Sequence, residues 1–132
     1  MNTTGKALFT TKAWEEKTYL ELDGGRKLTR VHAVFGYEGD LEGEGTLDYL
    51  MAYAPDGTGN FAGFEHVEGR IGDRKGSFVS QHNGVFDPKS VTTRLDFIAG
   101  LGMGALEGLS GGGELKLAGP GPYSFSFEYD FE

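Results

Sequence analysis

A glutamate and a histidine stand at positions of the sequence that otherwise carry apolar side chains. Glu65 shares an alternating face with Phe61 and Val67, and His82 shares one with Phe78. Because successive side chains of a strand point to opposite faces, this alternation predicts that both polar side chains point inward. A buried carboxylate beside an imidazole can exchange a proton with a bound molecule, so Glu65 and His82 are candidates for acid/base catalysis.

The turn between these two segments decides whether Glu65 and His82 meet. A two-residue loop at residues 73–74 would place Glu65 directly opposite His82. A two-residue loop at residues 72–73 would make them diagonal neighbours within side-chain reach. An odd-numbered loop would instead pair His66 with His82. We favour the glutamate–histidine pair because it keeps the apolar residues inward. The alternative to a catalytic role is a structural one, in which Glu65 and His82 form a buried polar pair and satisfy each other's hydrogen bonds.

The elements that must position this pair are strands. Apolar and polar residues alternate with a period of two in eight segments, which favours β-structure. These segments are residues 5–16, 28–38, 45–54, 60–71, 76–86, 91–99, 114–117 and 123–132. Clusters of Gly, Pro and Asp between them are typical of turns. The glycine-rich residues 100–113 predict a short 3₁₀-like turn that joins two strands.

Eight antiparallel strands with one apolar face each close into a barrel or pair as a sandwich. Short connections favour up-and-down order, and closure removes exposed edges. We therefore predict an all-β fold, a closed antiparallel β-barrel of about eight strands, as a single domain over residues 1–132. The predicted inner wall comprises Phe35, Tyr37, Tyr49, Met51, Tyr53, Phe61, Phe78, Phe97, Phe125, Phe127 and Tyr129.

Length, composition and charge exclude several classes of protein. A chain of 132 residues fits one domain and buries enough surface for a core without disulfides or metal. The absence of cysteine excludes disulfides, zinc–thiolate sites, iron–sulfur clusters and thiol catalysis. With 12 basic against 20 acidic residues, a nucleic-acid partner is disfavoured. No apolar run or signal architecture indicates a membrane partner or secretion, so we expect a cytoplasmic protein.

Familiar cofactor and metal motifs are missing from the sequence. It has no dinucleotide-binding glycine motif, P-loop, His-Glu-x-x-His or Gly-x-Ser-x-Gly. Residues 56–60 resemble the start of a calcium loop, but Val67 stands where a bidentate glutamate is needed. The alternation places His32 and His66 outward, away from His82, which disfavours a three-histidine metal site. We therefore predict neither a metal nor another cofactor.

Further inward residues could line a ligand site. The hydroxyls of Tyr37, Tyr49 and Tyr53 could hydrogen-bond a ligand oxygen or only fill volume. The predicted ligand-binding wall is Tyr37, Tyr49, Met51, Tyr53, Phe61 and Phe78. We expect Trp14 to plug a barrel end or a subunit contact rather than to stack on a ligand. Outer apolar residues could form a patch that favours a homo-oligomer; they are Leu8, Leu50, Phe64, Val79 and Ile98.

An ordered set of segments across nearly the whole chain resembles a bacterial family known only as a domain of unknown function, numbered 3224. The segments are Trp14-Glu15-Glu16, Lys27-Leu28-Thr29-Arg30, Gly43-Glu44-Gly45-Thr46, residues 49–53, residues 61–69, residues 76–79 with Gln81-His82, and residues 108–111. The resemblance implies a barrel similar to that of plant allene oxide cyclase and a cavity within it. It implies no established activity, and no catalytic residue transfers from the cyclases, because only the fold is shared.

Two functions follow from these observations. The first is a barrel that binds a small apolar or aromatic molecule and isomerises or cyclises it with Glu65 and His82, with enzymatic activity left open. The alternative is a non-catalytic carrier or assembly module with a filled barrel. An interior void of a few hundred cubic ångströms that contains both polar groups would favour the first function.

Overall fold

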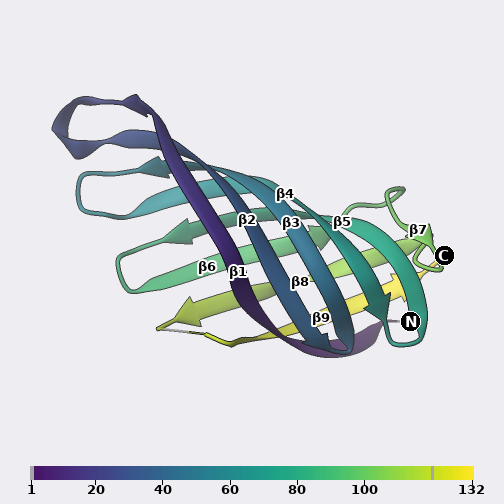
Figure 1. Ribbon diagram of the computed structural model, residues 1–132. Helices are drawn as coiled ribbons and strands as arrows, with labels where there is room; N and C mark the ends of the chain where they lie inside the picture. Colours follow the sequence, from purple (N-terminus) through teal and green to yellow (C-terminus); the bar gives the residue numbers. More distant parts are fainter. Residues whose placement is uncertain (1, 120) are drawn as a thin grey trace.

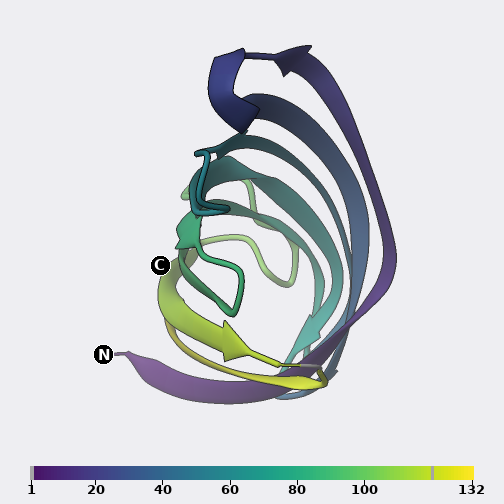
Figure 2. The ribbon, with the colours of Figure 1, turned by 90° about the vertical axis from the view of Figure 1, so that its left-hand side faces the viewer.

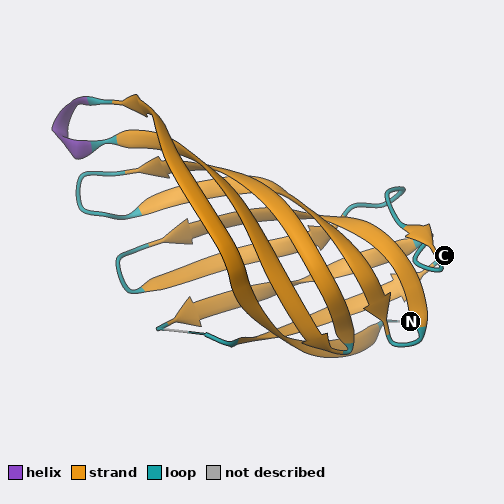
Figure 3. Ribbon diagram, viewed as in Figure 1, coloured by secondary structure: helices purple, strands orange, loops and turns teal. Residues whose placement is uncertain are grey.

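Strands make up most of the computed structural model, which describes residues 2–119 and 121–132 (Figure 3). The elements in chain order are β1 (Thr3–Glu21), the 3₁₀ helix η1 (Asp23–Gly25), β2 (Lys27–Gly39), β3 (Leu41–Tyr53), β4 (Gly59–Ile71), β5 (Arg74–Phe86), β6 (Ser90–Phe97), β7 (Met103–Gly104), β8 (Leu109–Ala118) and β9 (Tyr123–Phe131). Within these ranges, no helix has the length and apolar character needed to cross a bilayer.

Eight of these strands close into an antiparallel barrel, as the sequence predicts. Each of β1 to β5 pairs with the next strand along the chain, β6 pairs with β8, and β8 pairs with β9. Pairing of β9 with the first part of β1, from Thr3↔Tyr129 to Phe9↔Tyr123, completes the ring (Figures 1 and 2). The two-residue β7 adds only to β5.

The period-two pattern of the sequence sorts side chains between the interior and the surface. In β3, for example, Leu47, Tyr49 and Met51 are buried while the residues between them are exposed. Of the predicted inner wall, all residues except Tyr53 and Tyr129 are buried, and these two are half-buried and pack against the core. The interior is dominated by aromatic rings, which contact one another mostly in tilted or edge-to-face geometry.

The first strand is longer than predicted, because its pattern is interrupted. β1 continues to Glu21 rather than ending at residue 16. Its register against β2 shifts between Thr11 and Ala13 and again between Thr18 and Leu20. Such bulges reverse the order of inward and outward side chains, so the period of two is lost. The pairing of β1 with β9 ends at Phe9, whereas its pairing with β2 continues to Glu21, and the side chains of residues 10–21 are exposed.

The glycine-rich segment contains more strand than predicted. Met103 and Gly104 form β7, and hydrogen bonds from Leu106 N to Met103 O (3.2 Å) and from Glu107 N to Gly104 O (3.3 Å) form the expected tight turn. β8 then begins at Leu109, ahead of the predicted residue 114. Three consecutive glycines, 111–113, lie in this strand, and without side chains they produce no alternation to detect.

Candidate functional site

Glu65 on β4 and His82 on β5 meet inside the barrel. Residue 65 lies opposite Ser80 and residue 82 opposite Gly63, which makes them the diagonal neighbours expected for a loop at residues 72–73. The Nε2 atom of His82 lies 2.9 Å from Oε1 of Glu65. Glu65 is only 1% exposed and His82 only 2%. Glu65 and His82 therefore point inward and contact each other, as the alternation of the sequence predicts.

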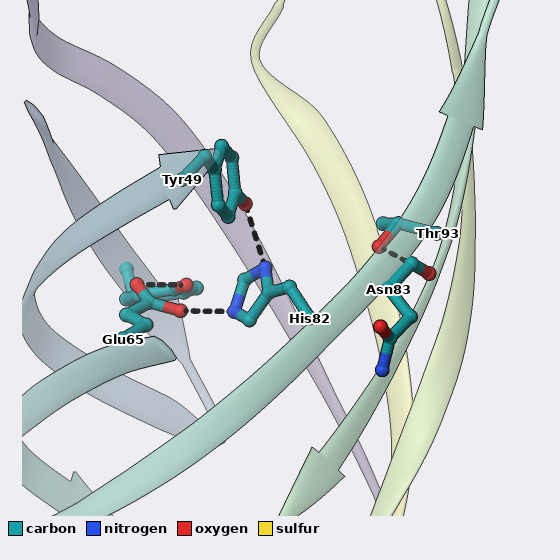
Figure 4. A network of polar contacts seen from close by, with 6 residues as sticks. Tyr49, Glu65, His82, Asn83 and Thr93 are labelled. Atoms are coloured by element: carbon teal, nitrogen blue, oxygen red, sulfur yellow. Dashed lines mark hydrogen bonds and ion pairs between the residues drawn. The ribbon is translucent and has the colours of Figure 1, made fainter. Parts of the chain in front are cut away.

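Two tyrosines extend the pair into a chain of four residues, Tyr37, Glu65, His82 and Tyr49, here called the polar chain. The Tyr37 hydroxyl, on β2, donates a hydrogen bond of 2.6 Å to Oε2 of Glu65. The Tyr49 hydroxyl, on β3, lies 2.6 Å from Nδ1 of His82 (Figure 4). Four strands thus contribute one group each, and every polar side-chain atom of Glu65 and His82 has a partner.

A glycine makes room for the carboxylate. Gly45 on β3 lies two positions from Leu47, the residue that faces Glu65 across the sheet, and a Cβ atom built on it would come within 1.9 Å of Glu65 Oε2. Any larger residue at position 45 would occupy the space that the carboxylate needs to reach Tyr37. Gly45 is therefore part of the site, although it contributes no functional group.

The electrostatic setting keeps both phenols neutral. Burial raises the pKa of the Tyr37 hydroxyl well above its ordinary value, and the negative charge of Glu65 raises it further. Burial and the Glu65 charge raise the pKa of Tyr49 in the same direction. At physiological pH both tyrosines therefore keep their protons and act as hydrogen-bonding groups rather than as tyrosinates.

The polar chain borders a pocket of about 200 Å³ inside the barrel. Its wall is largely aromatic and aliphatic, with residues Phe9, Phe35, Met51, Phe61, Phe86, Val91, Leu95, Leu115, Leu117 and Phe125. The remaining lining residues are Thr11, Trp14, Tyr37, Tyr49, His82, Thr93 and Tyr123. Among the described residues that line it, none is Lys, Arg, Asp or Glu. The pocket is therefore apolar except where hydroxyls and one imidazole reach its wall.

The predicted ligand-binding residues divide into two groups. Tyr37, Tyr49, Met51 and Phe61 line this pocket together with His82, whereas Tyr53 and Phe78 are outside its lining. Phe78 packs instead against Phe97 in the core, with ring centroids 5.0 Å apart. Glu65 is also outside the lining, so it reaches the pocket only through His82 and Tyr37.

A second cluster of polar contacts lies at the rim of the pocket, around Glu16 of β1. The Glu16 carboxylate accepts hydrogen bonds from Thr29 Oγ1 (2.7 Å), from Trp14 Nε1 (3.3 Å) and from the Tyr53 hydroxyl. Partial burial would raise the pKa of the Glu16 carboxyl, but these hydrogen bonds outweigh it and the pKa is lowered. Burial and the contact with Glu16 raise the pKa of Tyr53 to about 12.

Trp14 occupies the rim, between the pocket and solvent. Its side chain is 47% exposed, yet it lines the pocket and its ring centroid lies 6.4 Å from that of Tyr49. Trp14 thus borders the pocket that a ligand would occupy, and its role as a plug of a barrel end or as a subunit contact stays a prediction. Periodicity alone could not locate Trp14 and Glu16 at the rim, because the bulge in β1 shifts which residues point inward.

The other two histidines lie on the surface, away from the polar chain. His32 Nδ1 is 3.1 Å from Asp48 Oδ1, and both side chains are exposed. His66 is likewise exposed, with Nδ1 3.9 Å from Glu68 Oε1. Within residues 2–119 and 121–132, no group of three or more His, Asp and Glu side chains could hold a metal ion.

Comparison with known proteins places the chain in a family. The model of family DUF3224, described as a protein of unknown function, matches residues 5–129. The chain belongs to the DUF3224 family. A crystal structure of a DUF3224 protein with unknown function from Shewanella oneidensis MR-1 is similar, with a TM-score of 0.78 and 26% sequence identity over 100% of this chain and 98% of that one. Among curated proteins, none matches the chain. The likeness of this DUF3224 barrel to allene oxide cyclase stays a prediction.

Proposed function

We propose that this DUF3224 barrel binds one small apolar or aromatic molecule inside its pocket and that the polar chain acts on it as an acid/base pair. The observation that carries the proposal is the place of His82 at the wall of an otherwise apolar pocket, with the carboxylate of Glu65 2.9 Å behind it. Ligand sites in proteins combine an apolar wall with a few converging polar groups in this way.

The volume of the pocket limits the size of the ligand. At about 200 Å³, it exceeds the roughly 150 Å³ apolar cavity that takes up benzene. It is smaller than the roughly 300 Å³ at which sites for drug-sized ligands begin. The ligand is therefore a compound of one or two small rings, or an aliphatic chain of similar volume.

The roles within the acid/base pair follow from the geometry. His82 lines the pocket, and because its Nδ1 contacts the Tyr49 hydroxyl, it exchanges a proton with the ligand through that hydroxyl. Glu65 holds the imidazole from behind, and its negative charge stabilises the imidazolium that forms when His82 takes up a proton. An isomerisation that shifts a double bond needs only such proton movements. A cyclisation forms its new ring bond at the expense of a π bond or a strained ring of the same substrate, so neither reaction needs a co-reactant. The resemblance to allene oxide cyclase adds an analogy of fold to this proposal.

One observation favours the alternative of a non-catalytic carrier. Both ring nitrogens of His82 are already hydrogen-bonded within the protein, to Glu65 and to Tyr49. A carrier would use the same pocket, with the polar chain fixing the barrel interior rather than reacting.

Native mass spectrometry of the protein purified from its own organism tests both proposals. We expect one small ring compound per chain, released when the protein is denatured. Replacement of Glu65 by Gln keeps its shape and a hydrogen-bonding group, so the Glu65→Gln protein should fold but convert or retain the compound less well. His66→Gln, on the outer face of the same strand, is the matched control. Unchanged handling of the compound by both Glu65→Gln and His82→Gln would contradict the acid/base role, and absence of any bound compound would contradict the binding function.

A further inference from the structure

The hydrogen atoms of the polar chain determine which chemistry a ligand meets. The Tyr37 hydroxyl donates a hydrogen bond of 2.6 Å to one oxygen of Glu65, and Nε2 of His82 lies 2.9 Å from the other oxygen. The remaining contact, between His82 Nδ1 and the Tyr49 hydroxyl at 2.6 Å, can run in either direction. If Nδ1 is bare, Tyr49 donates to it; if Nδ1 carries a hydrogen, Tyr49 accepts and its own O–H is released.

A ligand oxygen beside Tyr49 selects the second arrangement. Only in that arrangement can the O–H of Tyr49 turn to the ligand while the Tyr49 oxygen still accepts a hydrogen bond from Nδ1–H of His82. The described pocket wall has no Lys or Arg that could donate to the ligand oxygen instead. The raised pKa of Tyr49, caused by its burial and by the Glu65 charge, keeps that hydrogen in place.

Three of the other four hydroxyls at the described pocket wall have acceptors within the protein. Tyr37 donates to Glu65, Thr93 donates to the carbonyl of Asn83 at 3.1 Å (Figure 4), and Tyr123 donates to the carbonyl of Gly119 at 2.7 Å. Thr11 is exposed at the rim. Tyr49 differs from these because its partner, Nδ1 of His82, can itself supply the hydrogen.

We propose that the pocket recognises an uncharged ring compound through one hydrogen-bond-accepting oxygen, such as a ketone, which receives the O–H of Tyr49. This rests on the proposed binding function and names the ligand class for the same pocket. A charged ligand is disfavoured because the described lining offers no opposite charge. Tyr49 is then a specificity-determining residue, and His82 and Glu65 position and polarise its hydroxyl.

Calorimetric titration with two probes of nearly equal shape tests this assignment. The probes are 1-indanone, which has a ketone oxygen, and indane, which lacks it. Tyr49→Phe should weaken 1-indanone binding about tenfold, the effect of one strong hydrogen bond, while indane binding stays within about twofold. The affinity of each probe for the variant is divided by its affinity for the wild-type protein. The different solubilities of the two probes in water cancel in this ratio. Tyr129→Phe is the matched control, because Tyr129 packs against the core outside the pocket lining, so the loss of its hydroxyl should leave the ratio between the probes unchanged.

The outcomes separate this inference from the proposed function. Equal losses for both probes in Tyr49→Phe, or no loss for 1-indanone, would overturn the role of Tyr49 while leaving the binding function intact. Failure of the wild-type protein to bind either probe would overturn both. If Tyr49→Phe does not fold, the infrared carbonyl stretch of 1-indanone bound to the wild-type protein decides: a shift to lower wavenumber than in a hydrocarbon solvent supports the hydrogen bond, and an unshifted band contradicts it.

Discussion

Replacing Gly45 with alanine should disconnect the polar chain without altering any of its four residues. The added methyl group would lie 1.9 Å from Oε2 and 2.7 Å from Cδ of Glu65. Atoms cannot approach so closely, so the carboxylate must move away from Tyr37 and His82. Gly45 is not among the residues with a positive φ, so this contact is the expected source of the cost.

The magnitude follows from the hydrogen bonds that the displaced carboxylate loses. Hydrogen bonds to a charged group contribute about 1.5–3 kcal/mol each, and Glu65 makes two of them. The lower conformational entropy of the unfolded alanine chain offsets about 0.4–1 kcal/mol. We therefore expect Gly45→Ala to lower the free energy of unfolding by about 2–6 kcal/mol, measured by urea denaturation.

A double-mutant cycle separates this cause from a general effect on the strand. In a Glu65→Ala background the carboxylate is gone, so adding Gly45→Ala should cost nothing and could recover some stability by filling space. Each single variant should destabilise the protein, with a coupling energy of about the size expected for Gly45→Ala alone. An equal cost of Gly45→Ala in both backgrounds, or a cost below about 0.5 kcal/mol in the wild-type background, would refute the steric reasoning.

Three further predictions follow from the core, the rim and the outer surface. Phe127 is 1% exposed, so Phe127→Ala should lower the free energy of unfolding by about 3–5 kcal/mol in urea denaturation; a loss below about 1 kcal/mol would contradict its place in the core. The lowered pKa of Glu16 contributes stability that is present above the ordinary carboxyl value of 4.5 and is lost as pH falls through the lowered value. Thermal melts below about pH 4.5 should therefore bring wild type and Glu16→Gln closer together, and a constant difference down to pH 2 would argue against the shift. Leu8, Leu50 and Phe64 are exposed on the outer wall, and we expect self-association in sedimentation at micromolar concentration, which a single 14.2 kDa species would exclude.

The strand pattern could be predicted because one face of most strands is buried. Glu65 and His82 interrupt strongly apolar faces, and that interruption was sufficient to identify them. The choice between the two registers of β4 against β5 depends on the turn that joins these strands. Pairing of Ile71 with Arg74 places Gly72 at the first loop position, where its φ of 60° is the left-handed conformation that glycine adopts easily.

The rest of the site depends on geometry that a strand pattern does not contain. Tyr37 and Tyr49 were expected to point inward, but their hydrogen bonds to Glu65 and His82 result from how four strands are offset around the barrel. The space over Gly45 is visible only once the neighbouring strand is in place. The pocket volume likewise depends on how aromatic rings from many strands pack, which varies with small changes in side-chain conformation.

Uptake of xenon decides most directly whether the barrel interior accepts an apolar guest. An apolar pocket of about 200 Å³ is large enough for xenon, which occupies smaller engineered cavities of roughly 150 Å³. We predict a saturable ¹²⁹Xe chemical-shift change with the wild-type protein, and its loss in a folded Leu115→Trp variant, whose larger side chain fills the pocket. A wild-type protein that shows no saturable shift, or a Leu115→Trp variant that binds xenon equally well, would contradict a ligand site inside the barrel.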